Sequence, residues 1–264
     1  MAGLLMFRLS VCAETVFRSL PFLERARRIN RAGFLVEFWR RDGAEVEALA
    51  AGRIRVSTMS GSDEGSMMHP GGVTAFLQGV ERRLALAQRL GCRELNLLTN
   101  ALAENGASGH PAAPHPATMW ITAYTTLSQV AELAERHDVV YNLEPLNTKL
   151  DHPGYPLPRV EDVVRLVEKV GSPRIKLLFD VYHAQVQEGN VIQLIRDFHS
   201  YIGYVHVADV PGRHEPGTGE INYPHVAKAL MQAGYDGIIG LEAFPAGDDA
   251  EAMRRFREIF AAQE

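Results

Sequence analysis

Short apolar runs alternate with longer amphipathic segments along the whole chain. An unbroken run rich in Val, Ile and Leu is typical of a strand that is buried on both faces in a parallel sheet. Eight such runs predict strands, over residues 4–10, 34–39, 53–59, 94–99, 139–143, 175–179, 202–207 and 237–241. Eight segments of helical periodicity predict helices, over residues 22–32, 45–51, 73–90, 117–136, 160–170, 191–199, 223–233 and 250–261.

The alternation of predicted strands and helices indicates a parallel sheet built from right-handed crossovers. The chain has 264 residues, a length at which eight such units close into one (β/α)8 barrel, the TIM barrel. Neither a linker nor a change of composition divides it, so residues 1–264 are predicted to form a single domain. A doubly wound α/β sheet is the alternative, but the fingerprints GxGxxG and GxxxxGK[ST] that would support it do not occur.

The fifth to eighth predicted strands each end on a residue that can bind a metal ion or move a proton. These residues are Glu144, Asp180, His206 and Glu242, separated by 36, 26 and 36 positions. In a barrel all C-terminal strand ends open onto one face, and neighbouring strands lie about 4.8 Å apart. We therefore expect the four side chains to converge. The alternative, that each residue merely ends a strand at a solvated loop, explains one such residue better than four matched ones.

Three carboxylates and one imidazole form a mainly oxygen ligand set, which suits Mg²⁺ or Mn²⁺ and leaves Co²⁺ or Zn²⁺ open. A divalent cation would also relieve the repulsion between the carboxylates. His183 follows Asp180, at the end of the sixth strand, by three residues and would stand just above the ligands, unless it only packs there. Arg213, in the loop after the seventh strand, could neutralise an oxyanion or could be an ordinary surface arginine.

Composition narrows the classes of partner. The formal net charge is −5, whereas nonspecific nucleic-acid binding favours a basic surface. A cluster of arginines between residues 25 and 31 is interpreted as a solvated helix face. Cys12 and Cys92 offer neither a disulfide framework nor a CxxC metal pair, and both are expected to be reduced and structural.

The apolar runs also bear on the cellular location of the protein. Residues 1–14 superficially resemble a secretion signal, but Arg8 interrupts the apolar run and a first strand is favoured. No apolar run approaches the ~18–20 residues of a membrane span. We therefore expect no membrane partner and a cytoplasmic location.

Five runs of the chain resemble one known family: LEPLN at 143–147, FDVYH at 179–183, HVAD at 206–209, EPGTGEINY at 215–223 and GLE at 240–242. They resemble the xylose-isomerase-like TIM barrels, and most closely the hydroxypyruvate isomerase branch. The run EPGTGEINY is long and specific, and the shorter runs follow in the correct order. VEFW at 36–39 is similar to the end of the family's second strand.

The resemblance implies a role for each candidate residue. Glu144 and Glu242 would bind the metal and act as the acid/base pair, while Asp180 and His206 would complete the metal site. His183 and Arg213 would contact oxygens of a small-molecule substrate. The implied reaction is an aldose–ketose isomerisation through an enediolate, of hydroxypyruvate to tartronate semialdehyde or of a 2-oxo-tetronate. Family members often associate, which implies a homo-oligomer.

Two departures keep other functions open. The segment 57–72 replaces an Asn-Leu-Pro-Ala-Gly-Asp-Trp-like run, and His206 replaces a glutamine that is frequent in hydroxypyruvate isomerases. Histidine there is more typical of ketose 3-epimerases acting on free sugars. AP endonucleases share the barrel and similar strand ends, but residues 211–220 lack their Asp-x-His pair. A non-catalytic sugar-binding barrel is the last alternative, and the roles of His69, His110 and His115 stay open.

Overall fold

The eight apolar runs pair side by side into a closed parallel barrel, in the order of the chain, with β8 paired to β1. The structure is a computed structural model that describes residues 7–41, 43–110 and 115–261. The strands are β1 (Arg8–Cys12), β2 (Leu35–Phe38), β3 (Val56–Ser60), β4 (Glu94–Leu97), β5 (Val140–Leu143), β6 (Ile175–Asp180), β7 (Ile202–Val207) and β8 (Ile238–Leu241). The predicted (β/α)8 barrel is therefore confirmed.

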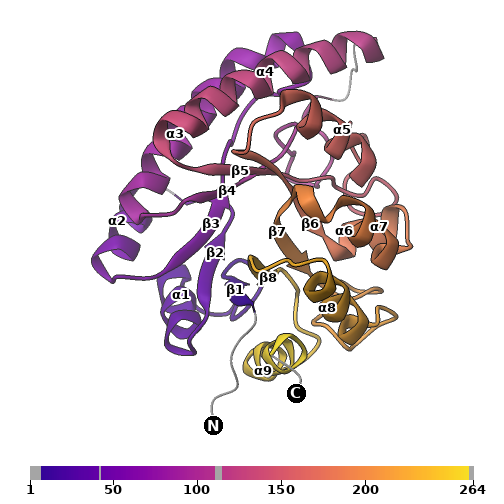
Figure 1. Ribbon diagram of the computed structural model, residues 1–264. Coiled ribbons are helices and arrows are strands. Elements are labelled where there is room, and N and C mark those ends of the chain that lie inside the picture. The colour runs from indigo at the N-terminus through magenta and orange to yellow at the C-terminus, as the bar shows by residue number, and fades with distance from the viewer. Residues whose placement is uncertain (1–6, 42, 111–114, 262–264) are drawn as a thin grey trace.

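The helices form an outer ring around the strands (Figure 1). They are α1 (Phe22–Arg31), α2 (Gly43–Ala51), α3 (Val73–Leu90), α4 (Pro116–His137), α5 (Val160–Val170), α6 (Val181–Gln187), α7 (Val191–Phe198), α8 (Tyr223–Gln232) and α9 (Asp249–Phe260), with 3-10 turns η1 (Pro70–Gly72) and η2 (His199–Tyr201). Helices α3 and α5 and strand β7 coincide with their predicted bounds.

Four predictions about local structure need correction. The third strand begins at Val56 instead of residue 53, because Arg53 has a left-handed φ of 51° that ends the preceding turn. Helix α4 begins at Pro116, one residue before its predicted start, and is capped by the His115 side chain, which accepts from the Ala117 N–H. Helix α6, directly after β6, was not predicted. The first strand lies at Arg8–Cys12, and residues 4–6 of its predicted range fall outside the described part of the chain.

The apolar core has two parts. The larger part lies between the sheet and the helices and contains the outward-facing strand residues. The smaller part is a separate cluster inside the barrel, formed by Leu178, Tyr204 and Ile238 with Leu35 packed against them. This plug fills the barrel below the C-terminal strand ends, so the polar side chains at those ends rest on a packed floor.

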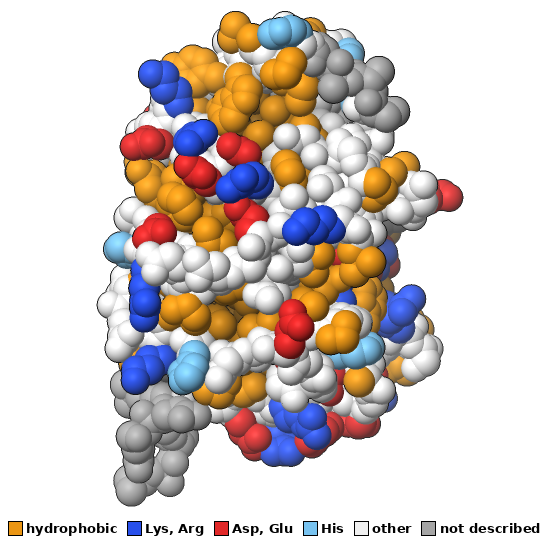
Figure 2. All heavy atoms as spheres, turned by 90° about the vertical axis from the view of Figure 1, so that its right-hand side faces the viewer, with side chains coloured by type: hydrophobic (Ala, Val, Ile, Leu, Met, Phe, Trp, Pro, Cys, Tyr) orange, Lys and Arg blue, Asp and Glu red, His pale blue; other side chains and the backbone are white. Residues whose placement is uncertain are grey.

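The surface and the cysteines agree with the composition. Basic and acidic side chains lie interspersed on the face shown in Figure 2. Arg28 and Arg31 pair with Glu24 on the exposed side of α1, as expected for a solvated helix face. Both cysteines are free and buried. None of the helices in the described part of the chain is long and apolar enough to cross a membrane.

Candidate active site

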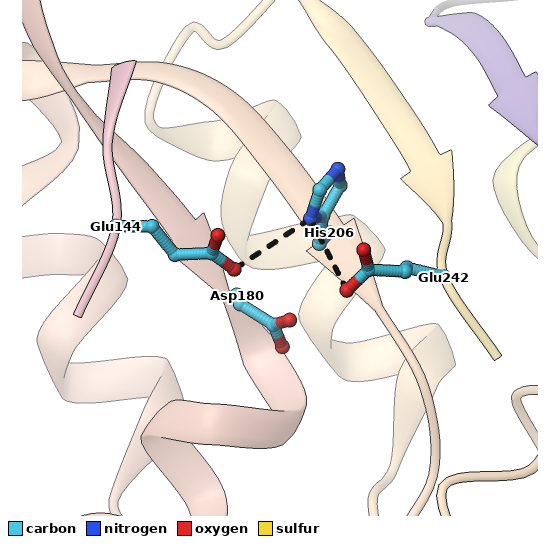
Figure 3. A group of neighbouring side chains, drawn as sticks. All are labelled: Glu144, Asp180, His206 and Glu242. Atoms are coloured by element: carbon cyan, nitrogen blue, oxygen red, sulfur yellow. Dashed lines mark ion pairs between the residues drawn. The ribbon is translucent and has the colours of Figure 1, made fainter. Parts of the chain in front are cut away.

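The four predicted strand-end residues meet at the C-terminal mouth of the barrel. Glu144 follows β5, Asp180 ends β6, His206 lies in β7 and Glu242 follows β8, and their side chains point toward one another (Figure 3). One ligand atom from each lies within 4.8 Å of the others. All four residues are at most 5% exposed. The convergence expected from the barrel topology is thus present in the structure.

The imidazole of His206 lies between the two glutamates. Its Nδ1 is 3.7 Å from Glu144 Oε1 and 3.7 Å from Glu242 Oε2. Burial alone would lower the pKa of His206, but the surrounding carboxylates, Glu37 foremost, hold that pKa well above its ordinary value. In this arrangement the imidazole offsets part of the buried negative charge.

Hydrogen-bond donors orient both glutamates. Asn96 Nδ2 donates to Glu144 Oε2 at 2.8 Å. The Trp39 indole donates to Glu242 Oε1 at 2.6 Å, and Arg213 donates to Glu242 Oε2 at 2.6 Å. Burial would raise the pKa of Glu242, but His206 and Arg213 outweigh it and hold that pKa below its ordinary value. Glu144 is therefore fixed by a donor on β4, and Glu242 by one donor that follows β2 and one in the loop after β7.

Asp180 joins the cluster to helix α6. Its side chain accepts from the His183 N–H at 3.0 Å and so caps the helix. Burial raises the pKa of Asp180 to about 7, against the opposing effect of Arg213. The helix that was not predicted therefore has a local cause, since Asp180 is both a strand end and an N-cap.

The predicted substrate contact His183 is held in one tautomer. Its Nδ1 accepts from Asn147 Nδ2 at 2.7 Å, and the Asn147 amide is oriented by donors to its oxygen from Leu150 and Asp151. The proton of the neutral ring therefore lies on Nε2, which is 3.8 Å from Asp180 Oδ2. Burial keeps the pKa of His183 well below its ordinary value, so the ring is neutral.

Arg213 lies beside the cluster, with only 16% of its side chain exposed. Its guanidinium pairs with Glu242 and lies 3.9 Å from Asp180 and 5.0 Å above the Tyr182 ring. The loop that carries it is held by Asp209, which accepts from four backbone N–H groups. The arginine is thus part of the charged cluster itself, a position that sequence reasoning did not assign.

The donor set fits a divalent cation. Opposite ligands of an octahedral ion lie about 4.2 Å apart when each bond is about 2.1 Å, close to the 4.8 Å span of the four ligand atoms. Glu144 Oε1 and His206 Nδ1 are buried without a hydrogen-bond partner in the described part of the chain. Because unpartnered buried polar atoms are costly, these two atoms are suited to ligation.

A cavity of about 380 Å³ opens above the cluster, a size typical of small-molecule sites. Glu144, His183, Arg213 and Glu242 line it together with Trp39. Four of the six predicted site residues thus face the space where a substrate would lie. Asp180 and His206 lie below it, as expected for ligands at the floor of the site.

The three histidines left open by the sequence lie elsewhere. His69 caps η1 and His115 caps α4 through their ring nitrogens. The His110 ring lies 5.8 Å from that of His69. None of the three is among the residues that line the cavity.

Sequence reasoning missed several residues that hold the site. Trp39, Asn96 and Asn147 are the donors described above, and Glu37 lies 3.3 Å from His206. A signal existed for Glu37 and Trp39, because the run FLVEFW places one acidic residue inside an otherwise apolar strand. The asparagines carry no comparable signal, since amides are common at strand ends and in loops.

Comparisons with known proteins agree with this architecture. Residues 37–259 match the family model for the xylose isomerase-like TIM barrel. Hydroxypyruvate isomerase of Escherichia coli K12 is 28% identical over 252 residues, covering 91% of this chain and 94% of that protein. The 2-oxo-tetronate isomerase of Cupriavidus necator is 34% identical over 176 residues, covering 67% of this chain and 64% of that protein. A solved structure named AP endonuclease, family 2, from Brucella melitensis has a TM-score of 0.84 at 29% identity, covering 95% of this chain and 98% of that one.

Proposed function

Because the chain belongs to the xylose isomerase-like TIM barrel family and is an isomerase, we propose that it interconverts the aldose and ketose forms of a small α-hydroxy carbonyl acid. The names of its relatives point to hydroxypyruvate and 2-oxo-tetronates as the substrate class. The observation that carries the proposal is the placement of Glu144 and Glu242. They follow β5 and β8, both line the cavity, and donors fix one oxygen of Glu144 and both oxygens of Glu242.

Glu144, Asp180, His206 and Glu242 would hold the divalent ion, with Mg²⁺ or Mn²⁺ favoured by the oxygen ligands and Co²⁺ or Zn²⁺ allowed by the imidazole. When bound, such an ion supplies Lewis-acid polarisation of the substrate carbonyl. This lowers the cost of removing a proton from the neighbouring carbon.

The residues of the chain move and place the protons. One glutamate takes the proton from the carbon that bears the hydroxyl, giving an enediolate, and the proton returns to the adjacent former carbonyl carbon. The hydroxyl proton passes to the other oxygen, so no oxidant or reductant is consumed. His183 donates from Nε2 to a substrate oxygen, and Arg213 keeps Glu242 in its charged form.

The same pair of glutamates also suits the ketose 3-epimerase alternative. Isomerisation needs the proton to move between two carbons, whereas epimerisation removes and returns it on opposite faces of one carbon. The two reactions therefore differ in which carbon gains solvent hydrogen.

Solvent deuterium exchange tests the proposal. Hydroxypyruvate, 2-oxo-tetronates and free ketoses are incubated in D₂O with the protein and Mg²⁺, Mn²⁺ or Co²⁺, and the labelled carbon is located by NMR. We expect label in the acids, accompanied by the isomeric product. Label confined to C3 of free ketoses would show that the reaction is an epimerisation and not an isomerisation. Cleavage of abasic-site DNA without any exchange would refute both reactions.

Substitution of the two glutamates identifies the residues responsible. Glu144→Gln and Glu242→Gln are each expected to abolish turnover while the circular dichroism spectrum stays unchanged. Glu94→Gln is the matched control, because Glu94 also lies in the barrel, bound to Asn142, but outside the cavity. Near-wild-type turnover in either site variant would refute the acid/base assignment.

A further inference from the structure

Glu37 is a buried carboxylate that the proposed reaction does not use. It lies in β2, is 2% exposed and faces the inside of the barrel. In the described part of the chain its ion-pair partner is His206, whose Nε2 lies 3.3 Å from Glu37 Oε1. Neither of these two atoms has a hydrogen-bond partner among the described residues. Each is therefore free to interact with the other.

The other side of the Glu37 carboxylate is fixed. The Tyr204 hydroxyl donates to Oε2 at 2.5 Å and also lies 3.1 Å from Ser57 Oγ. Ser57 Oγ in turn lies 2.6 Å from Ser10 Oγ. This chain of hydroxyls, on the apolar floor of the site, leaves Oε1 facing the imidazole.

Gly240 leaves the room that the carboxylate needs. A Cβ on Gly240 would lie 2.4 Å from Glu37 Oε2 and 2.7 Å from Oε1. A side chain at position 240 of β8 would therefore collide with the Glu37 carboxylate where it now lies. The barrel interior is shaped around this carboxylate.

The two nitrogens of His206 consequently face different partners. Nε2 faces Glu37, and Nδ1 faces Glu144 and Glu242. A neutral histidine carries its proton on one ring nitrogen and can accept or ligate with the other. We propose that Glu37 is a positioning residue that holds the proton of His206 on Nε2 and so directs the Nδ1 lone pair at the divalent ion. The inference rests on the proposed function for the presence of that ion.

The test compares Glu37→Gln with two controls. With Tyr204 donating to the amide oxygen, the amide nitrogen of Gln would face Nε2 and favour a proton on Nδ1, the wrong nitrogen. Tyr204→Phe removes a hydrogen bond from the same carboxylate but keeps the carboxylate beside His206. Glu94→Gln makes the same substitution elsewhere in the barrel. Circular dichroism and thermal melting check that each variant folds.

The first readout is Mn²⁺ binding to the purified protein by isothermal titration calorimetry. Loss of a partner that orients a ligating histidine typically costs about 10- to 100-fold in metal affinity, so Kd should rise by this factor in Glu37→Gln. Glu94→Gln should stay within about threefold of the wild type, because it lies outside the metal site. Tyr204→Phe should lose less affinity than Glu37→Gln, because it keeps the carboxylate beside His206. Gly240→Ala, which displaces the carboxylate without removing it, should weaken binding as Glu37→Gln does.

The second readout is the side-chain ¹⁵N spectrum of the histidines, with and without Zn²⁺, assigned with a His206→Asn variant. We expect a proton on Nε2 of His206 in the wild type and its loss from Nε2 in Glu37→Gln. Unchanged Mn²⁺ affinity together with an unchanged Nε2–H signal in Glu37→Gln would overturn the inference. If the wild type binds no Mn²⁺, the metal part of the proposed function fails, and the histidine spectrum still decides the role of Glu37.

Discussion

The hydrogen bond from Trp39 to Glu242 offers a direct test of the acid/base assignment. Trp39 Nε1 donates to Glu242 Oε1 at 2.6 Å, while Arg213 donates to the other oxygen. Trp39→Phe removes the first donor and keeps an aromatic ring at the same place. If Glu242 moves protons, the carboxylate should become less well oriented and catalysis should slow.

The size of the effect follows from the hydrogen bond. A hydrogen bond to a charged group contributes about 1.5–3 kcal/mol, and about 1.4 kcal/mol in transition-state stabilisation corresponds to a factor of ten in rate. Trp39 is 41% exposed, so water can partly replace the indole. The lower end therefore applies, and we expect kcat/KM to fall about tenfold.

The chain contains only two tryptophans, which gives a matched control. Trp120 lies on α4 and does not line the cavity, so Trp120→Phe should leave kcat/KM unchanged. In that variant the fluorescence of the remaining Trp39 should be quenched by Mn²⁺ bound beside Glu242. A kcat/KM for Trp39→Phe within twofold of the wild type would refute the idea that this indole orients a catalytic carboxylate.

Three further predictions follow from other parts of the structure. Asp209→Asn should remove the acceptor of two part-buried backbone N–H groups, those of Gly217 and Thr218, at a cost of about 0.5–1.5 kcal/mol each. Its melting temperature should therefore fall and, because the loop carries Arg213, kcat should fall as well. Burial raises the pKa of Cys92 to about 12 and that of Cys12 well above its ordinary value, so neither thiol should react with a disulfide reagent at pH 8 until guanidinium unfolds the protein. Burial raises the pKa of Asp180 to about 7, so protons on this ligand should compete with the metal below that pH. The Kd for Mn²⁺, measured by calorimetry, should rise by up to about tenfold per pH unit as the pH falls below 7, in addition to any competition from the proton of His206.

The barrel was predictable because its signals are local and repeated. Each strand is a short run rich in apolar residues, and helices such as Val73–Leu90 carry enough turns for their periodicity to be read. The convergence of Glu144, Asp180, His206 and Glu242 then follows from topology alone, since parallel strand ends share one face. Helix α6 was not predicted because its seven residues are too few for a periodic pattern.

The supporting residues were not predictable because their partners are distant along the chain. Glu37 and Tyr204 are 167 positions apart and Trp39 and Glu242 are 203 apart, although both pairs are in contact. Such pairs depend on the closure of the barrel and on which way a side chain turns inside it. A lone acidic residue in FLVEFW shows that something polar is buried there, but its partner appears only in three dimensions.

The charges of the site explain why its supporting residues are so closely packed. Glu144, Asp180 and Glu242 are buried beside two groups that can carry positive charge, Arg213 and His206. Buried charges are costly unless each is paired and hydrogen-bonded. The donors around the cluster therefore serve both stability and chemistry, because they offset buried negative charge and hold the carboxylates facing one point. The acidic excess that remains is the physical reason why the site suits a divalent cation.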